Sequence, residues 1–310
     1  MKKVGFVYDD IFLNHEMPAG HPESPQRLLK ILETLNDTQI WDKLIHIKPR
    51  CAEEEDILKV HTKDYFDTVK TFTGYYDADT YISDNSFEAA LFAAGAVIEA
   101  IDKCNKGEIE RAFCAVRPPG HHAEANRAMG FCIFNNVAIG ARYAQKIGYE
   151  KVFIVDFDVH HGNGTQHIFE EDDTVFYFST HQYPHYPGTG RDTEIGKGKG
   201  EGFTHNIPMQ YGSGDKEYLY AYATILPGLI KKFDPDIILI SAGYDIHSED
   251  PLSDITVSNE GIRSIVRNIL SCSTLTSHAV MPFIFALEGG YNLYALSESV
   301  LITLMEILGN

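Results

Sequence analysis

Four segments of this chain place metal-binding or proton-transferring side chains directly after an apolar run that predicts a buried strand. They are Arg117-Pro-Pro-Gly-His-His122, Asp156-Phe-Asp-Val-His-His161, Ala242-Gly-Tyr-Asp245 and Glu288-Gly-Gly-Tyr291. In open α/β sheets, ligands bind beyond the carboxyl ends of the strands, where residues distant in sequence meet. One such strand end could arise by chance, but four together indicate a site for metal-assisted hydrolysis.

The candidate metal ligands are two aspartates and one histidine. Asp158 and His160 are separated by one residue, so in an extended segment they project from the same face, together with Asp156. Asp245 is the expected third ligand, and Gly243 before it permits a sharp backbone turn toward the site. Two carboxylates and one imidazole suit zinc, iron(II) or a related divalent ion. Three protein ligands leave positions open for water and substrate, as in catalytic sites.

The adjacent His121 and His122 could assist such a metal. One imidazole can take the proton of the attacking water while the other stays cationic or protonates the leaving amine. We pair His121 with Asp156 and His122 with Asn163, because a buried carboxylate raises the pKa of an imidazole whereas a neutral amide only orients it. Tyr291 follows two glycines on a turn expected to be flexible, and its hydroxyl could hold the oxyanion of a tetrahedral intermediate. This combination describes hydrolysis of an amide carbonyl.

Each pattern also has a structural interpretation when taken alone. A single Asp-x-His is more often a hydrogen-bonded pair than a metal site, a Gly-Gly-Tyr is usually a turn with a packed aromatic ring, and Asp245 could cap a helix. Their joint occurrence at strand ends favours the functional interpretation. The chain contains no H-E-x-x-H, G-x-S-x-G or P-loop motif, so it offers no competing catalytic signature.

The elements that must position these residues alternate between apolar strands and amphipathic helices, which predicts an α/β protein with a mostly parallel central sheet covered by helices on both faces. The expected strands read as continuous apolar runs at 4–8, 112–116, 152–157, 174–179, 237–241 and 282–287. Helical periodicity covers 87–101, with Ser86 as the expected N-cap, and 137–147, 218–233, 259–270 and 293–308. Residues 1–310 are expected to form a single domain.

Composition narrows the functional classes. A formal net charge of -18 opposes direct binding to nucleic acid, whose phosphates are normally neutralised by Lys and Arg, and weakly favours cationic substrates. No segment has the length of a membrane span or the form of a secretory signal. The five cysteines are scattered and lack a C-x-x-C pair, which fits a reducing cytoplasm. No pattern indicates the oligomeric state.

With these residues considered together, the chain resembles the zinc-dependent histone deacetylase family, including bacterial histone deacetylase-like amidohydrolases and acetylpolyamine amidohydrolases. The resemblance spans nearly the whole chain. It is carried by His21-Pro-Glu-Ser-Pro-Gln-Arg27, Arg117 to His122, Gly130-Phe-Cys-Ile-Phe-Asn-Asn136, Asp156 to Gly164 and Leu287-Glu-Gly-Gly-Tyr291. Asn163 stands where class I members carry Asp, so the chain is more similar to class II.

The resemblance implies the arginase-deacetylase fold, with Asp158, His160 and Asp245 on zinc, His121 and His122 as the acid–base pair and Tyr291 polarising the carbonyl. It also implies an acyl-lysine tunnel walled by Phe131, after Gly130, and by an aromatic residue of the 181–188 loop, for which we expect Tyr186. Arg27 resembles the arginine near the family's acetate channel, although it could also be an ordinary surface residue at a helix start. A structural potassium ion is implied near Asp156, Asp158, His160, Ser179 and Thr180.

The expected substrate is an acylated lysine in a peptide or protein, or an acetylated polyamine. Leu252 occupies the position at which the polyamine-preferring eukaryotic member carries a Glu that reads a distant ammonium, which disfavours that device here. Two further alternatives are an arginase-like ureohydrolase, which would need additional carboxylates for a two-metal cluster, and a catalytically silent protein that binds a metal or an acyl group. Retention of both histidines and Tyr291 argues against the silent protein.

Overall fold

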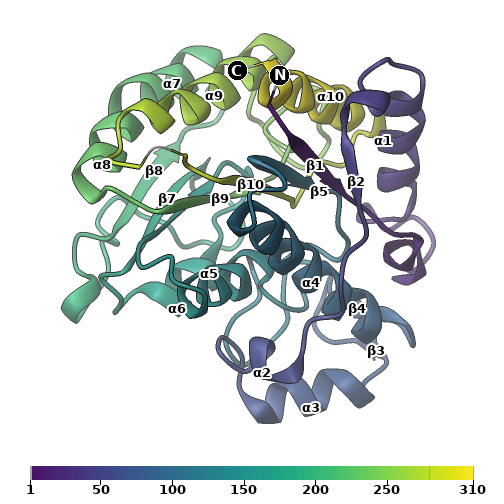
Figure 1. Cartoon of the computed structure of the whole chain (residues 1–310). Coiled ribbons are helices and arrows are strands. Elements are labelled where there is room, and N and C mark those ends of the chain that lie inside the picture. Colours follow the sequence, from purple (N-terminus) through teal and green to yellow (C-terminus); the bar gives the residue numbers. More distant parts are fainter. Residues whose placement is uncertain (1, 279, 310) are drawn as a thin grey trace.

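A parallel eight-stranded sheet forms the centre of the computed structural model, which describes residues 2–278 and 280–309 (Figure 1). Its strand order is β2-β1-β5-β10-β9-β6-β7-β8, and every pairing is parallel. The strands are β1 (Val4–Val7), β2 (Ile45–Ile47), β5 (Arg111–Cys114), β6 (Val152–Asp156), β7 (Val175–Gln182), β8 (Thr204–Met209), β9 (Ile237–Ala242) and β10 (Phe283–Leu287). The predicted fold class is confirmed.

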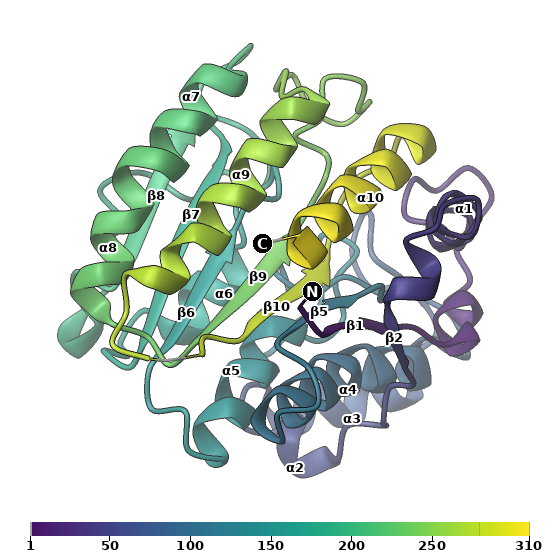
Figure 2. The ribbon, with the colours of Figure 1, turned by 45° about the horizontal axis from the view of Figure 1, so that its top comes forward.

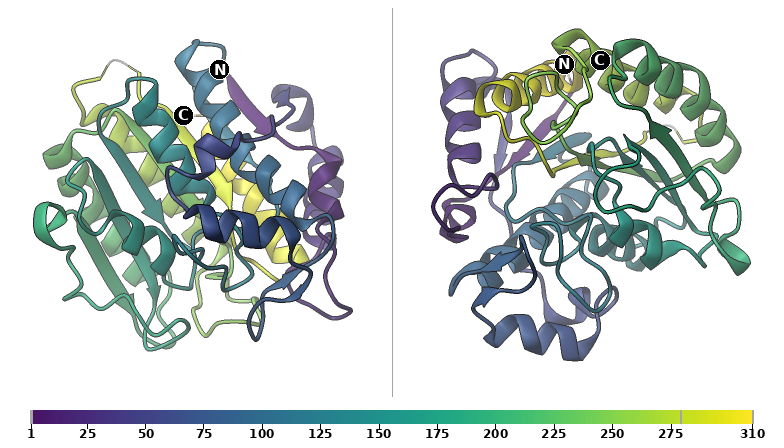
Figure 3. Two further views of the ribbon diagram at one scale, coloured as in Figure 1. Left: turned by 90° about the horizontal axis from the view of Figure 1, so that it is seen from below. Right: turned by 180° about the vertical axis from the view of Figure 1, so that it is seen from behind.

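Helices cover both faces of this sheet, which explains why its central strands are apolar and buried along their whole length. One face carries α1 (Gln26–Asn36), α7 (Asp215–Tyr220), α8 (Leu226–Phe233), α9 (Asn259–Ser271) and α10 (Leu293–Gly309) (Figure 2). The other carries α4 (Ser86–Asn105), α5 (Asn136–Lys146) and α6 (Asn163–Phe169), with α2 (Glu54–Ile57), α3 (Lys63–Thr71) and the small hairpin of β3 (Gly74–Tyr75) and β4 (Tyr81–Ile82) outside them (Figure 3).

The structure differs from the sequence prediction in a few elements. Ser86 is the first residue of α4 and Asn85 takes the N-cap position, while the Ser86 hydroxyl accepts the backbone N–H of Ser83 at 2.7 Å. The helix predicted over 218–233 begins earlier, at Asp215, and contains a π-helical segment at Ala221–Ile225 between α7 and α8. The predicted strand at 174–179 continues to Gln182.

The four chemistry-bearing segments follow four neighbouring strands at the middle of the sheet. β5, β10, β9 and β6 are consecutive in the strand order, and all run in the same direction. Their carboxyl ends therefore open at one place, and the loops that follow them share a single crevice.

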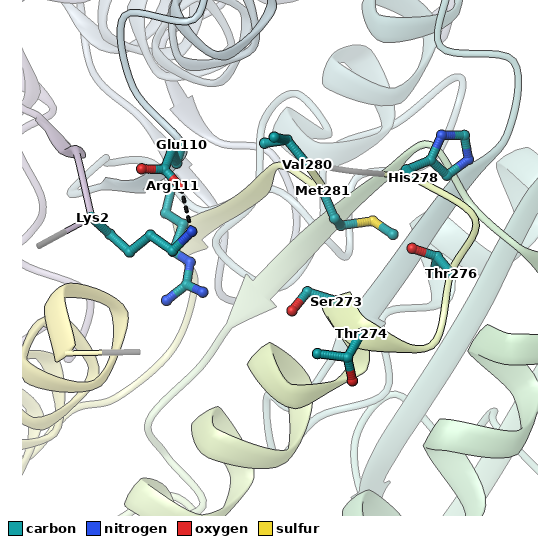
Figure 4. A pocket seen from close by; sticks show the side chains of 9 residues that line it. All are labelled: Lys2, Glu110, Arg111, Ser273, Thr274, Thr276, His278, Val280 and Met281. Atoms are coloured by element: carbon teal, nitrogen blue, oxygen red, sulfur yellow. Dashed lines mark hydrogen bonds and ion pairs between the residues drawn. The ribbon is translucent and has the colours of Figure 1, made fainter.

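A pocket of about 340 Å³ lies at the amino-terminal ends of β1, β5 and β10, on the side of the sheet opposite to the crevice (Figure 4). Lys2 and Arg111 line it, and the Lys2 ammonium bonds to Glu110. Arg111 also donates to the carbonyl oxygen of Ile307 near the end of α10, at 3.1 Å. A cation at this position complements the helix C-terminus, so Arg111 has a structural role. The pocket is separate from the crevice, because the two lie at opposite ends of the strands.

Two predictions about the environment of the protein relate to this fold. All five cysteines are free thiols, and a cytoplasmic location stays a prediction. Within residues 2–278 and 280–309, no helix combines the length and the apolar character required to cross a bilayer.

Candidate metal centre and acid–base site

The three expected metal ligands converge. Ligand atoms of Asp158, His160 and Asp245 all lie within 4.8 Å of one another, and both aspartates are buried. His160 Nδ1 is 3.2 Å from Asp158 Oδ1 and 3.1 Å from Asp245 Oδ2. The sequence predicted that alternation along an extended strand would bring these residues together. In the structure β6 ends at Asp156 and the chain bends through 158–160, so the convergence has a different cause.

Backbone groups and two glycines hold these carboxylates in place. Asp245 Oδ1 accepts the N–H of Val159 at 2.9 Å, and Asp158 Oδ2 accepts the N–H of Gly289 at 2.8 Å. A Cβ at Gly243 would lie 2.0 Å from Asp158 Oδ2, and one at Gly289 would lie 2.1 Å from Asp245 Oδ2. Gly243 therefore permits close approach of the Asp158 carboxylate. The φ of Gly243 does not lie in the positive region that a glycine-dependent turn would use.

The donor set has the charge expected of a divalent-cation site. Burial and the nearby Asp158 carboxylate raise the pKa of Asp245 to about 7. Burial alone would lower the pKa of His160, but its hydrogen bonds to Asp158 and Asp245 raise that pKa to about 10. Without a metal, this protonated imidazole partly neutralises the two buried carboxylates. A dication would do the same more completely and would displace the proton, so these residues fit the metal that the sequence predicts.

The two histidines make the two expected hydrogen bonds, and their rings lie 4.0 Å apart between centroids. His121 Nδ1 is 3.0 Å from Asp156 Oδ2, and His122 Nδ1 is 2.8 Å from Asn163 Oδ1. Burial opposes a charge on His121, but Asp158 and Asp156 raise its pKa to about 10. Burial and the charge of His121 hold the pKa of His122 well below its ordinary value. These opposite pKa shifts favour a cationic His121 beside a neutral His122.

Hydrogen bonds from two sides hold the loop of Tyr291, for which the sequence predicted a flexible turn. Arg27 donates from Nε to the Gly290 carbonyl at 2.7 Å and from Nη2 to the Glu288 carbonyl at 2.5 Å. On the other side, Asp250 Oδ2 accepts the N–H of Tyr291 at 2.6 Å. The Arg27 guanidinium lies 5.1 Å from the centre of the Tyr291 ring. Arg27 is fully buried, so its interpretation as a surface residue at a helix start is wrong.

The expected tunnel residues lie around the histidines and Tyr291. The Phe131 ring is 5.8 Å from the Tyr291 ring, and the Tyr186 ring is 5.2 Å from the His122 ring. Gly130 has φ +57°, and a Cβ there would come within 2.4 Å of the His122 ring, so this residue packs directly on the imidazole. Leu252 contributes its carbonyl oxygen, 3.1 Å from Nε2 of His185.

The residues predicted to surround potassium lie on neighbouring strands. Asp156 at the end of β6 is in register with Ser179 on β7 and with Ser241 on β9. Ser179 Oγ is 2.9 Å from His181 Nδ1, and Thr180 Oγ1 is 2.9 Å from the hydroxyl of Tyr222. The buried Ser241 Oγ has no hydrogen-bond partner within the described part of the chain. An oxygen donor left free beside Asp156 suits a hard cation, and this site stays a prediction.

Sequence reasoning assigned no role to several residues that support the site. Arg117, the first residue of the Arg-Pro-Pro-Gly-His-His segment, is fully buried and donates to Glu23 and to the carbonyl oxygen of Phe12. The His185 ring stacks on the His160 ring at 5.2 Å. Glu23 and Glu288 both lie within motifs that carry the family resemblance, and the acidic residue in each of these motifs was the available signal.

Comparison with known proteins agrees with this architecture. The family model described as histone deacetylase domain matches residues 21–307, and the chain belongs to this family of deacetylases. A probable deacetylase of Archaeoglobus fulgidus is 39% identical over 93% of this chain and 81% of its own length. The crystal structure of the HDA15 HD domain superposes with a TM-score of 0.92 at 37% identity, covering 99% of this chain and 91% of that one.

Eukaryotic relatives differ in length and in the substrates that their names record. Histone deacetylase 5 of Arabidopsis thaliana is 38% identical over 99% of this chain, which spans 49% of that protein. Polyamine deacetylase HDAC10 of Danio rerio is 37% identical over 94% of this chain and 45% of its own length. The chain therefore corresponds to about half of these longer relatives.

Proposed function

We propose that the protein is a metal-dependent deacetylase that hydrolyses the amide of an N-acetylated primary amine to acetate and the free amine. The observation that carries the proposal is the convergence of Asp158, His160 and Asp245 beside a histidine pair with two different partners. Zinc is the expected ion and iron(II) is compatible with the same donors. When bound, the ion would polarise the carbonyl and lower the pKa of water.

The side chains of the chain supply the proton transfers. His122, held neutral and oriented by Asn163, accepts a proton from the attacking water. His121, whose pKa is raised by Asp158 and Asp156, stabilises negative charge on the reacting carbonyl as a cation and delivers a proton to the leaving amine. The Tyr291 hydroxyl donates to the oxyanion, and its pKa, raised by burial and the nearby aspartates, keeps it protonated for this role.

The proposed substrate is an acetyl-lysine side chain in a peptide or protein, or an acetylated polyamine. Phe131 lies beside Tyr291 and Tyr186 lies beside His122, and both rings would contact the apolar methylene chain of either substrate. The names of the relatives cover both classes, since one is a polyamine deacetylase and others are histone deacetylases. The arginase-like alternative receives less support, because the group Asp158, His160 and Asp245 has only three ligands and the other candidate group, His121, Cys132 and Glu288, includes the proposed acid–base histidine.

The proposal is tested by hydrolysis of a fluorogenic acetyl-lysine peptide and of acetylated polyamines by the zinc-loaded protein. We expect hydrolysis that chelator abolishes and added zinc restores. Metal analysis should give one catalytic ion per chain, and Asp245→Asn should lose both the ion and the activity. A fully loaded protein that hydrolyses none of these amides would contradict the proposal.

A further inference from the structure

A buried carboxylate joins two of the loops that form the site. Glu288 is the first residue after β10, is fully solvent-excluded, and faces the loop that follows the neighbouring strand β5. Its Oε2 accepts two backbone N–H groups of that loop, from Gly120 at 2.6 Å and from His121 at 3.2 Å. A carboxylate that accepts two adjacent amides fixes the course of the backbone between them.

The contact adds a third anchor to His121. Its carbonyl oxygen accepts the N–H of Thr165 at 3.1 Å, and its ring is bound to Asp156. The turn cannot shift easily, because a Cβ at Gly120 would already lie 2.5 Å from the backbone nitrogen of Asn136. Of these anchors, only the Glu288 carboxylate comes from the loop that carries Tyr291, so it relates the position of the imidazole to that of the tyrosine.

Retention of a carboxylate here requires a reason, because burial of this group is unfavourable. Its Oε1 has no hydrogen-bond partner among the described residues, and burial raises the pKa of the carboxyl to about 7. Burying a partly unsatisfied acid costs stability. An apolar side chain of similar size would remove that cost, but it would leave the two amides of the His121 turn without an acceptor.

We propose that Glu288 is a positioning residue that sets the placement of His121 relative to Tyr291 by accepting the N–H groups of Gly120 and His121. It does not touch the reacting atoms. This inference rests on the proposed deacetylase function, because the effect of a misplaced His121 is measured as a loss of deacetylation rate. The positioning role requires an acceptor oxygen on a side chain of the right length. The amide of Gln should therefore substitute for the carboxylate of Glu288, and the thioether of Met should not.

The test compares Glu288→Met, which keeps the volume and removes the acceptor, with Glu288→Gln, which keeps an acceptor oxygen. In the zinc-loaded protein we expect Glu288→Met to lower kcat about 10- to 100-fold with KM and zinc content unchanged. Glu288→Gln should retain most of kcat. Glu288→Asp, which is one methylene shorter, should fall between them, and it replaces Glu288→Met if that variant does not fold.

A matched control removes another buried carboxylate that lies outside the site. Glu306 on α10 is 7% exposed and pairs with Arg263 and Arg267 at 2.6 and 2.8 Å. We expect Glu306→Met to lower the melting temperature and leave kcat unchanged. Equal kcat in Glu288→Met and the native protein, or an equal loss of kcat in Glu288→Gln and Glu288→Met, would overturn the positioning role.

A second readout is independent of catalysis. In protein labelled with ¹⁵N-histidine, the Nδ1–H of His121 reports its hydrogen bond to Asp156 by NMR. We expect this signal to shift or broaden in Glu288→Met and to be preserved in Glu288→Gln and Glu306→Met. If the native protein hydrolyses no acetylated amine, the proposed function fails, while an unchanged His121 signal in Glu288→Met would overturn the positioning inference alone.

Discussion

At the scale of single residues, two neighbouring histidines of the site have pKa values shifted in opposite directions. His121 and His122 are both buried, so burial disfavours a charge on each. The difference comes from the charges nearby: the carboxylates of Asp158 and Asp156 raise the pKa of His121, whereas His122 is bonded to the neutral amide of Asn163 and lies beside the charge of His121. The electrostatic asymmetry of the pair thus depends on residues more than 30 positions away in sequence.

Exchanging the amide partner for a carboxylate should change the pH dependence of the reaction. Asn163→Asp would raise the pKa of His122, which is now held low, so the imidazole would lose its proton only at higher pH. If His122 must be neutral to accept a proton, the acidic limb of the kcat/KM profile moves to higher pH.

The control for this exchange follows from a second hydrogen bond of Asn163, which joins it to Glu124. Its Nδ2 donates to Glu124 Oε1 at 2.6 Å, so the substitution alone would oppose two carboxylates. The variant should therefore be made with Glu124→Gln, and Glu124→Gln alone should leave the profile in place. An acidic limb that does not move in the double variant would exclude His122 as the base.

The hydroxyl of Tyr291 offers a second prediction at this scale. Tyr291→Phe removes one oxygen and keeps the ring that contacts Phe131 and Arg27. Loss of one oxyanion donor should lower kcat about 10²- to 10³-fold with zinc content and stability unchanged. Steady-state kinetics on metal-verified protein measure this, and an undiminished rate would remove Tyr291 from the mechanism.

At the scale of elements, the metal ligands and the histidine pair lie in segments that follow the carboxyl ends of the strands, and glycine makes the close approaches possible. Gly130 is such a position, because its φ is +57° and the His122 ring fills the space of a Cβ. Gly107 has a similar φ of +69° with no atom within 4 Å of its Cβ position. The two glycines therefore share the backbone requirement and differ in the contact.

This pair separates backbone strain from the placement of His122. Gly107→Ala should cost about 1 kcal/mol of stability, the approximate penalty of a side chain in the left-handed region, and leave kcat unchanged. Gly130→Ala should show at least that cost and also lower kcat, since the new methyl group displaces the imidazole. Chemical denaturation and kinetics on both variants check this, and equal kcat values would show that the contact at Gly130 is unimportant.

The sequence predicted elements well where a strand is buried on both faces and poorly where it is not. β5, β6, β9 and β10 read as apolar runs because helices cover them on both sides. β2 at one edge has only three residues, two of them exposed, and β8 at the other edge contains Pro208 and Asn206. Edge strands lack the continuous apolar signal, so they were not predicted.

At the scale of the whole molecule, the order of the strands creates the site, and periodicity does not determine that order. The sequence showed four chemistry-bearing strand ends, whereas the structure shows that β5, β10, β9 and β6 are adjacent. The same limit applies to Arg27 and Glu288, whose partners lie 261 and 168 positions away. Short motifs therefore revealed the ligands and the histidine pair, but not the long-range contacts that hold them.

The metal-free and metal-loaded molecules should differ in stability in a pH-dependent way. Without metal, His160 binds a proton between two carboxylates, and its pKa is raised to about 10. Zinc must displace that proton, so above pH 7 its affinity should rise about tenfold per pH unit. Below pH 7 the rise should be steeper, because Asp245, whose pKa is raised to about 7, also binds a proton there. At a free zinc concentration of about 100 Kd, the folded state should gain about 2.7 kcal/mol. The melting temperature should therefore rise on adding zinc, and by more at higher pH.

Competition with a chromophoric chelator at several pH values measures this affinity, and thermal unfolding with and without zinc measures the stability. His160→Asn should abolish high-affinity binding and the gain in melting temperature. His46→Asn, at an exposed histidine on β2, should leave both unchanged. A zinc affinity independent of pH would mean that no proton is displaced, and the proposed coupling between the buried carboxylates, His160 and the ion would be wrong.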